Sequence, residues 1–145
     1  MNLAWLLWLA SLMPQPTADR ICLASAVYLE ARGQSAVGQM AVAEVALRRR
    51  ESGQWGANLC AVLTARGQFA LSTTPKSYIF DNVESWNRAW LVAGVSMTVW
   101  SLPPQWRLAI VPKADHFFAA NTEVPSWAKG MPLARIGDHN FYRAD

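Results

Sequence analysis

The chain has 145 residues, of which 52% are hydrophobic, and it carries a formal net charge of +3. This length is typical of one domain, and the apolar share excludes a disordered chain. The basic excess is small and its longest run is Arg48-Arg49-Arg50, so we expect no nucleic-acid partner. A mild positive charge suits attraction to an anionic polymer.

Residues 1–16 form an apolar segment and linker, and we assign the main domain to residues 17–145. The apolar stretch ends at Pro14-Gln15-Pro16 and is shorter than the roughly 20 residues that span a bilayer. No Lys or Arg precedes it, and no small-x-small cleavage site closes it. Three interpretations stay open: an export signal or weak anchor, which we favour, a helix docked on the domain, or a membrane-surface segment.

Apolar periodicity and capping residues predict helices in the first two thirds of the chain. Thr17 and Asp19 are expected to cap the first of them, Gly33 to stop it and Ser35 to cap the second. Glu44 and Arg48 form an i,i+4 pair that we expect on the surface. The segment 65–83 is expected to be irregular. The predicted helices cover residues 20–31, 36–50, 59–64 and 85–100.

The last third of the chain changes in character. Residues 116–118 and 139–142 are short, aromatic-rich and typical of strands, and the segment 121–132 between them is punctuated by Pro and Gly. These segments predict a small antiparallel hairpin. Helices followed by a small sheet indicate an α+β fold.

Several classes of site are excluded by the absence of their motifs. The chain has no Gly-rich phosphate loop, dinucleotide fingerprint, HExxH or GxSxG. A metal site from His116, His139 and a carboxylate has no local spacing to support it, so we expect no metal and no cofactor. Cys22 and Cys60 are either free thiols or one disulfide, and we favour the disulfide.

Glu30 is the carboxylate best placed for acid chemistry. It follows Val27-Tyr28-Leu29 at the end of an apolar helix, where desolvation would raise the pKa of its carboxyl group. A glutamate that keeps its proton can act as a general acid toward a glycosidic oxygen. The alternative is an ion pair of Glu30 with Arg32 or Arg20 at a helix end.

Six sequence elements, in order over about residues 20–143, resemble those of the SleB-like cell-wall hydrolases. The match depends on their order and spacing, because any one of them alone is unspecific. The elements are Cys22-Leu23-Ala24 with Tyr28 to Ser35, Gly38 to Ala43, Cys60 to Leu63, Gln68-Phe69, His116 to Ala119 with Pro125-Ser126-Trp127, and Ile136 to Tyr142.

This resemblance implies a lysozyme-like, transglycosylase-like domain that binds peptidoglycan glycan strands and cleaves the MurNAc–GlcNAc β-1,4 bond. Glu30 matches the family's catalytic acid, and no second carboxylate carries over, which implies a lytic transglycosylase. The protein would then be exported to the periplasm or cell wall. The short chain and apolar start also fit a phage-encoded lysis enzyme with transient membrane contact through residues 1–13.

The resemblance also implies substrate contacts, each of which competes with a purely structural interpretation. The chain departs from the family at Gln34, where a second glutamate is frequent, and at Ala70-Leu71, which replace Ser-Trp. Phe117 or Phe118 must face the core, because neighbours on a strand alternate. The candidate substrate-binding residues are Gln68, Phe69, His116, Trp127, His139 and Tyr142.

Three rival hypotheses stay open beside the transglycosylase. A true muramidase would place a second acid, Glu44, Asp81 or Asp115, opposite Glu30 at about 5–10 Å. A non-catalytic wall-binding module would leave Glu30 exposed or locked in an ion pair. A membrane-disrupting protein would act through residues 3–13.

Overall fold

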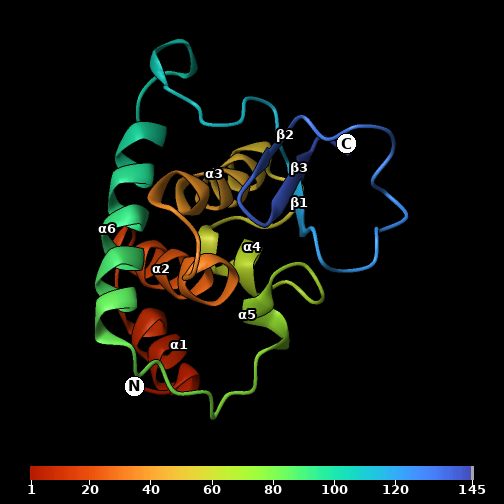
Figure 1. Cartoon of the computed structure of the whole chain (residues 1–145). Coiled ribbons are helices and arrows are strands. Elements are labelled where there is room, and N and C mark those ends of the chain that lie inside the picture. The colour runs from red at the N-terminus through yellow and green to blue at the C-terminus, as the bar shows by residue number, and fades with distance from the viewer. Residues whose placement is uncertain (145) are drawn as a thin grey trace.

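The structure is a computed structural model that describes residues 1–144, and it confirms the α+β prediction. It is mostly helical, with a small antiparallel sheet near the C-terminus, an arrangement consistent with a lysozyme-like domain (Figure 1). The elements are α1 (Leu3–Leu12), α2 (Thr17–Ala31), α3 (Ala36–Ser52), α4 (Leu59–Thr64), α5 (Ala70–Thr73), α6 (Val83–Trp100), the 3-10 helix η1 (Pro104–Trp106), β1 (His116–Ala119), β2 (Ala134–Ile136) and β3 (His139–Tyr142).

Helix α2 forms the centre of the core. Nearly every residue from Ala18 to Tyr28 is buried, and the helix contacts all five other α-helices. Figure 1 shows α6 running along one side of α2 and α3, with the sheet at the opposite side. The C-terminal turn of α2 carries Glu30.

Helix α1 is docked on α2 in this structure. Leu3, Leu6 and Ala10 are buried, and the main chain of residues 1–4 pairs with residues 76–80. Trp5, Trp8 and Leu12 lie on the exposed side of the helix. Within residues 1–144, no helix is long and apolar enough to cross a membrane.

The sheet has three strands in the order β1-β3-β2, so the predicted two-stranded hairpin was incomplete. Strand β3 pairs antiparallel with both neighbours, and Phe117 lies opposite Phe141. The unpredicted strand β2 follows the long segment 121–132, which Figure 1 shows extending away from the body. Strand alternation puts Phe117, His139 and Phe141 on one face and His116, Phe118 and Tyr142 on the other.

Side-chain caps explain most of the helix starts. Ser35 accepts a hydrogen bond from the main-chain N–H of Gly38, Asn58 from that of Ala61 and Asn82 from that of Ser85. The predicted cap of α2 was wrong, because the carboxylate of Asp19 instead accepts the N–H of Leu59 and pairs with Arg50.

Two further predictions need correction. Glu44 is buried rather than on the surface, because residues 110–111 fold over it and donate both of their N–H groups to its carboxylate, which also pairs with Arg48. The segment 65–83 contains the short helix α5.

Cys22 and Cys60 form a disulfide that joins α2 to α4, with their Cα atoms 5.3 Å apart.

Candidate functional site

Glu30 lies in the last turn of α2 and is partly exposed. Its Oε1 accepts a hydrogen bond from the main-chain N–H of Ala70 at 2.5 Å, at the start of α5. This contact places the carboxyl group between the end of a buried helix and the loop that enters α5.

Burial raises the pKa of the Glu30 carboxyl, and the hydrogen bond from Ala70 lowers it by a smaller amount. Within residues 1–144, Glu30 has no ion pair. Arg20 lies over the ring of Trp90 at 4.1 Å, and Arg32 donates to the hydroxyl of Tyr28 at 2.6 Å. The alternative in which Glu30 pairs with Arg20 or Arg32 was therefore wrong.

His139 lies on β3 next to the end of α2. Burial lowers the pKa of its ring, while Asp138 and a hydrogen-bonding interaction with the backbone of Glu30 raise it. The ring contacts Phe117 edge-on with centroids 5.3 Å apart. His139 thus approaches the main chain of Glu30, and a histidine whose pKa is lowered stays neutral at pH 7.

Phe69 and Gln39 support this region from within the domain. Phe69 is buried and packs against Phe117 with ring centroids 5.9 Å apart. Gln39 is buried and its Nε2 donates to the carbonyl of Ala31 at 3.0 Å, which holds the end of α2 in place. Sequence reasoning missed Gln39, although it lies in the Gly38 to Ala43 element.

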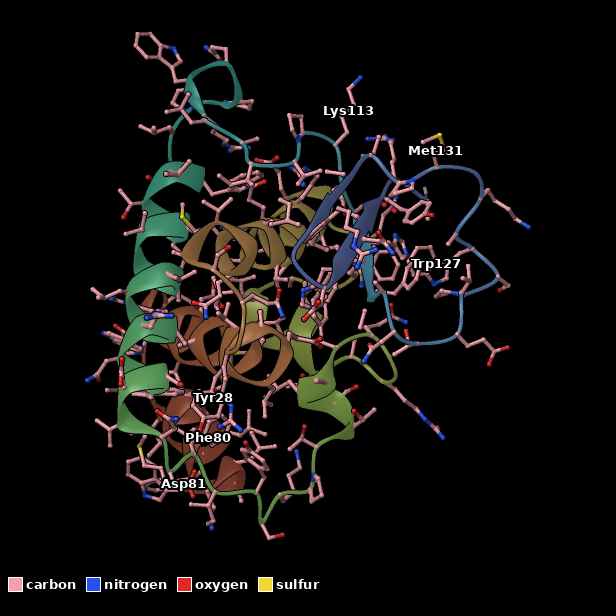
Figure 2. The ribbon with its side chains drawn as sticks, in the orientation of Figure 1. Tyr28, Phe80, Asp81, Lys113, Trp127 and Met131 are labelled. Carbon is pink, nitrogen blue, oxygen red and sulfur yellow. A yellow bond between two sulfur atoms is a disulfide. The ribbon has the colours of Figure 1, made fainter. Side chains whose placement is uncertain are left out.

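A second cluster, here called the aromatic cluster, covers the outer face of the sheet. It consists of Trp55, His116, Phe118, Trp127 and Tyr142. The ring of Trp127 lies 4.6 Å from that of His116 and 5.9 Å from that of Tyr142, by centroids. Figure 2 shows Trp127 reaching from its loop toward the strands.

Tyr142 is held in the aromatic cluster by its ring, and its hydroxyl makes a separate polar contact with the loop 121–132. Its hydroxyl donates to the carbonyl of Gly130 at 3.1 Å, and its ring stacks on Phe118. The predicted substrate residues therefore fall into two groups on opposite faces of the sheet. His139 and Phe69 lie with Glu30, whereas His116, Trp127 and Tyr142 lie in the aromatic cluster.

Arg49 connects the two groups, and sequence reasoning missed it. Its side chain lies over the rings of Trp55 at 4.1 Å and Phe69 at 5.0 Å. It also donates to the side chain of Gln68 at 3.1 Å and to the carbonyl of Asp115 at 2.7 Å. The signal was present in the basic run 48–50, but nothing in the sequence shows which of three arginines is buried.

The acids proposed as a second catalytic group have other contacts. Glu44 is held by the main chain of residues 110–111. Asp115 accepts the N–H of Ala144 and contacts His116 at 2.8 Å. Asp81 is exposed and lies near Tyr28 and Phe80 in Figure 2, by α1. None of the three contributes to the pKa shift of Glu30.

The site thus offers one carboxyl group with a raised pKa, an imidazole with a lowered pKa near its main chain and an aromatic surface on the neighbouring sheet. Within the described residues 1–144, no group of three or more His, Cys, Asp or Glu side chains could hold a metal ion.

One comparison with known proteins identifies the family of the chain. A family model described as Cell Wall Hydrolase matches residues 33–142, a stretch that begins just after Glu30 and includes the whole sheet. No curated protein and no solved structure matches the chain. Because the model covers most of the chain, the protein belongs to the cell wall hydrolase family.

Proposed function

We propose that the protein is a lytic transglycosylase that cleaves the MurNAc–GlcNAc β-1,4 bond of peptidoglycan, with Glu30 as its acid and then its base. The observation that carries the proposal is the environment of Glu30. Its carboxyl is desolvated and has a raised pKa, one main-chain donor and no ion pair within residues 1–144. Family membership supports peptidoglycan as the substrate.

In the first step, protonated Glu30 transfers its proton to the glycosidic oxygen. The C1–O bond of MurNAc breaks with both electrons going to that oxygen, which leaves as the 4-hydroxyl of GlcNAc. A raised pKa helps this step because it keeps the proton on Glu30 closer to neutral pH. The positive charge that develops at C1 lies near the newly formed Glu30 carboxylate.

In the second step, the Glu30 carboxylate accepts the proton of the 6-hydroxyl of the same MurNAc. Oxygen O6 then bonds to C1 and closes a 1,6-anhydro ring, and Glu30 is protonated again. Because the nucleophile belongs to the substrate, the step gains from proximity and needs no positioned water. A single carboxyl group suffices for this sequence, in line with the other contacts of Glu44 and Asp115.

Two alternatives predict different products. A muramidase would use a positioned water and yield reducing MurNAc ends. A wall-binding module would release no fragments, but the burial of Glu30 without an ion pair among residues 1–144 argues against it.

The deciding experiment is mass spectrometry of fragments released from purified peptidoglycan by the wild type and by Glu30→Gln. The proposal expects 1,6-anhydro-MurNAc ends from the wild type and none from the variant. Reducing ends that are also lost in the variant would make the enzyme a hydrolase. Absence of fragments with every wall type tested would overturn catalysis altogether.

We also propose that the enzyme acts outside the cytoplasmic membrane and touches that membrane through α1. Trp5 is 45% exposed and Trp8 is 57% exposed. Tryptophan is favoured at lipid–water interfaces. Flotation with phosphatidylglycerol vesicles tests the contact, and Trp5→Ser with Trp8→Ser should abolish it. Equal flotation of both proteins would contradict the contact.

A further inference from the structure

A cationic cavity lies between the end of α6, the segment 104–113 and the C-terminal residues. Its volume is about 750 Å³. Four cationic side chains line it, against the single carboxylate of Glu51. The four are Arg48, Arg107, Lys113 and Arg143.

Two of these cations are held by the protein. Arg107 forms a bidentate pair with Glu51, with N···O distances of 2.7 and 3.0 Å, and this pair lowers the pKa of Glu51. Arg48 donates to the carbonyl of Ala114 and lies 3.8 Å from Glu44. Each of these two side chains is paired with a carboxylate, and most of their donors are occupied.

The other two cations are available to a ligand. Within residues 1–144, Lys113 and Arg143 have no side-chain hydrogen bond or ion pair. Lys113 has a φ of 71°, a value that residues with a side chain rarely adopt. Figure 2 shows its side chain projecting from the segment that follows η1. Lys113 is thus an exposed cation at the rim of the cavity.

The wall of the cavity is preorganised around Trp100. The guanidinium groups of Arg48 and Arg107 lie 5.0 and 4.7 Å from its ring centroid. The indole N–H of Trp100 is buried and has no hydrogen-bond partner among the described residues. A buried donor without a partner lowers the stability of the fold.

The cationic cavity continues toward the aromatic cluster. A smaller cavity of about 170 Å³ shares Arg48 and Arg143 with it and is also lined by Trp55. Trp55 contacts His116 edge-on, with ring centroids 5.5 Å apart. A ligand with an apolar or sugar part on the aromatic cluster could therefore reach the cations with an anionic branch.

We propose that this cavity binds the carboxylates of the peptide stems that branch from the glycan strand. The choice of ligand rests on the proposed function, since a peptidoglycan strand carries short peptides with free carboxylates beside each cleavable bond. Lys113 and Arg143 contact the carboxylates directly, and Arg48 and Arg107, held over Trp100, form the wall of the cavity. Planar guanidinium groups match carboxylates in two-point hydrogen bonds.

Isothermal titration calorimetry tests the site with three probes at constant ionic strength. The probes are a synthetic stem peptide with free carboxylates, the same peptide with every carboxylate amidated, and inorganic phosphate. The proposal expects binding of the free peptide and at least about tenfold weaker binding of the amidated one, since hydrogen bonds to charged groups contribute that much. Phosphate binding as tight as that of the free peptide would overturn it in favour of a phosphate site.

Matched variants separate the cavity from overall charge. Lys113→Gln with Arg143→Gln removes two charges at the cavity, and Lys76→Gln with Arg88→Gln removes two charges elsewhere on the surface. The cavity variant should weaken peptide binding about tenfold. The control variant should bind as the wild type does, and equal weakening by both would overturn the site.

The calorimetry requires no bond cleavage, so one proposal can be contradicted while the other stands. Peptide binding that depends on Lys113 and Arg143, without fragments from any wall, would remove the transglycosylase and leave the site. Fragments with 1,6-anhydro ends, without any peptide binding, would remove the site and leave the enzyme.

Discussion

Gln34 and Asp138 exchange two hydrogen bonds between the helical body and the sheet. The amide Nε2 of Gln34 donates to Oδ2 of Asp138 at 3.0 Å, and the N–H of Asp138 donates to Oε1 of Gln34 at 3.0 Å. This pairing fastens the loop between α2 and α3 to the turn between β2 and β3. Gly137 completes the turn at a φ of 56°, where a Cβ atom would lie 2.1 Å from Oε1 of Gln34.

Gln34→Glu should destabilise the protein, although the family frequently has glutamate there. The change replaces a donor with a carboxylate oxygen that faces the carboxylate of Asp138. We expect a loss of about 1 kcal/mol in the free energy of unfolding at pH 7, because the pair is solvent-accessible. Urea unfolding measures it.

Adding Asp138→Asn to Gln34→Glu restores a donor and should recover most of the stability at pH 7. A double variant as unstable as the single one would contradict a direct interaction between residues 34 and 138.

Glu30→Gln should raise the melting temperature at neutral and basic pH. The folded-state pKa of Glu30 is raised above its unfolded value by burial. Its contribution to stability is therefore present at acidic pH and is lost as the pH rises through the folded pKa. A glutamine cannot ionise and avoids that loss. Scanning calorimetry at several pH values should show the gain growing with pH, and Glu123→Gln, on an exposed loop, should show none.

The same raised pKa sets the pH dependence of cleavage. The first step needs the proton of Glu30, so the rate of fragment release should fall as the pH rises through that pKa. Glu30→Gln should lower the rate by about 10²–10⁴-fold, the usual contribution of a general acid. A variant that keeps the wild-type rate and pH profile would assign the chemistry to another group.

Leu6→Ala should destabilise the whole domain, because α1 is part of its core. Leu6 is 2% exposed and lies on the side of α1 that packs on α2. Its truncation should cost about 3 kcal/mol in unfolding free energy. Leu12 on the same helix is 62% exposed. Leu12→Ala should therefore change stability by less than about 0.5 kcal/mol. Equal urea midpoints for both variants would mean that α1 does not pack on α2 in solution.

Removing the disulfide should lower the free energy of unfolding, because the unfolded chain gains conformational entropy when the cross-link is absent. Cys22 and Cys60 are 38 residues apart in the sequence. Closing a loop of this size contributes about 3–4 kcal/mol. Cys22→Ser with Cys60→Ser should therefore unfold at a lower urea concentration than the oxidised wild type. Once both proteins are assayed in excess reductant, their midpoints should agree, and a persistent gap would point to packing rather than the cross-link.

The elements that depend on local signals could be predicted from the sequence. Ser35 and Asn58 mark the starts of α3 and α4 because a short polar side chain before an apolar helix pattern is a local feature. The partial burial of Glu30 follows equally from its place at the end of an apolar helix.

The parts that depend on long-range contacts could not be predicted. Strand β2 is short and gains its identity from pairing with β3. The i,i+4 pair of Glu44 and Arg48 is typical of an exposed helix face, and only the folded structure shows that residues 110–111 cover it. The sequence does not show that Tyr142 and Glu30 lie apart, because this follows from the register of β1 against β3, which places Tyr142 on the outer face of the sheet.

The buried side chain of Arg49 joins the aromatic cluster to the loop before α5. It touches Trp55 of the aromatic cluster at one end and Gln68 at the other, and Gln68 shortly precedes Ala70, the hydrogen-bond donor to Glu30. A substitution at Arg49 would therefore disturb two places at once, the face of the aromatic cluster and the loop that carries the hydrogen-bond donor to Glu30.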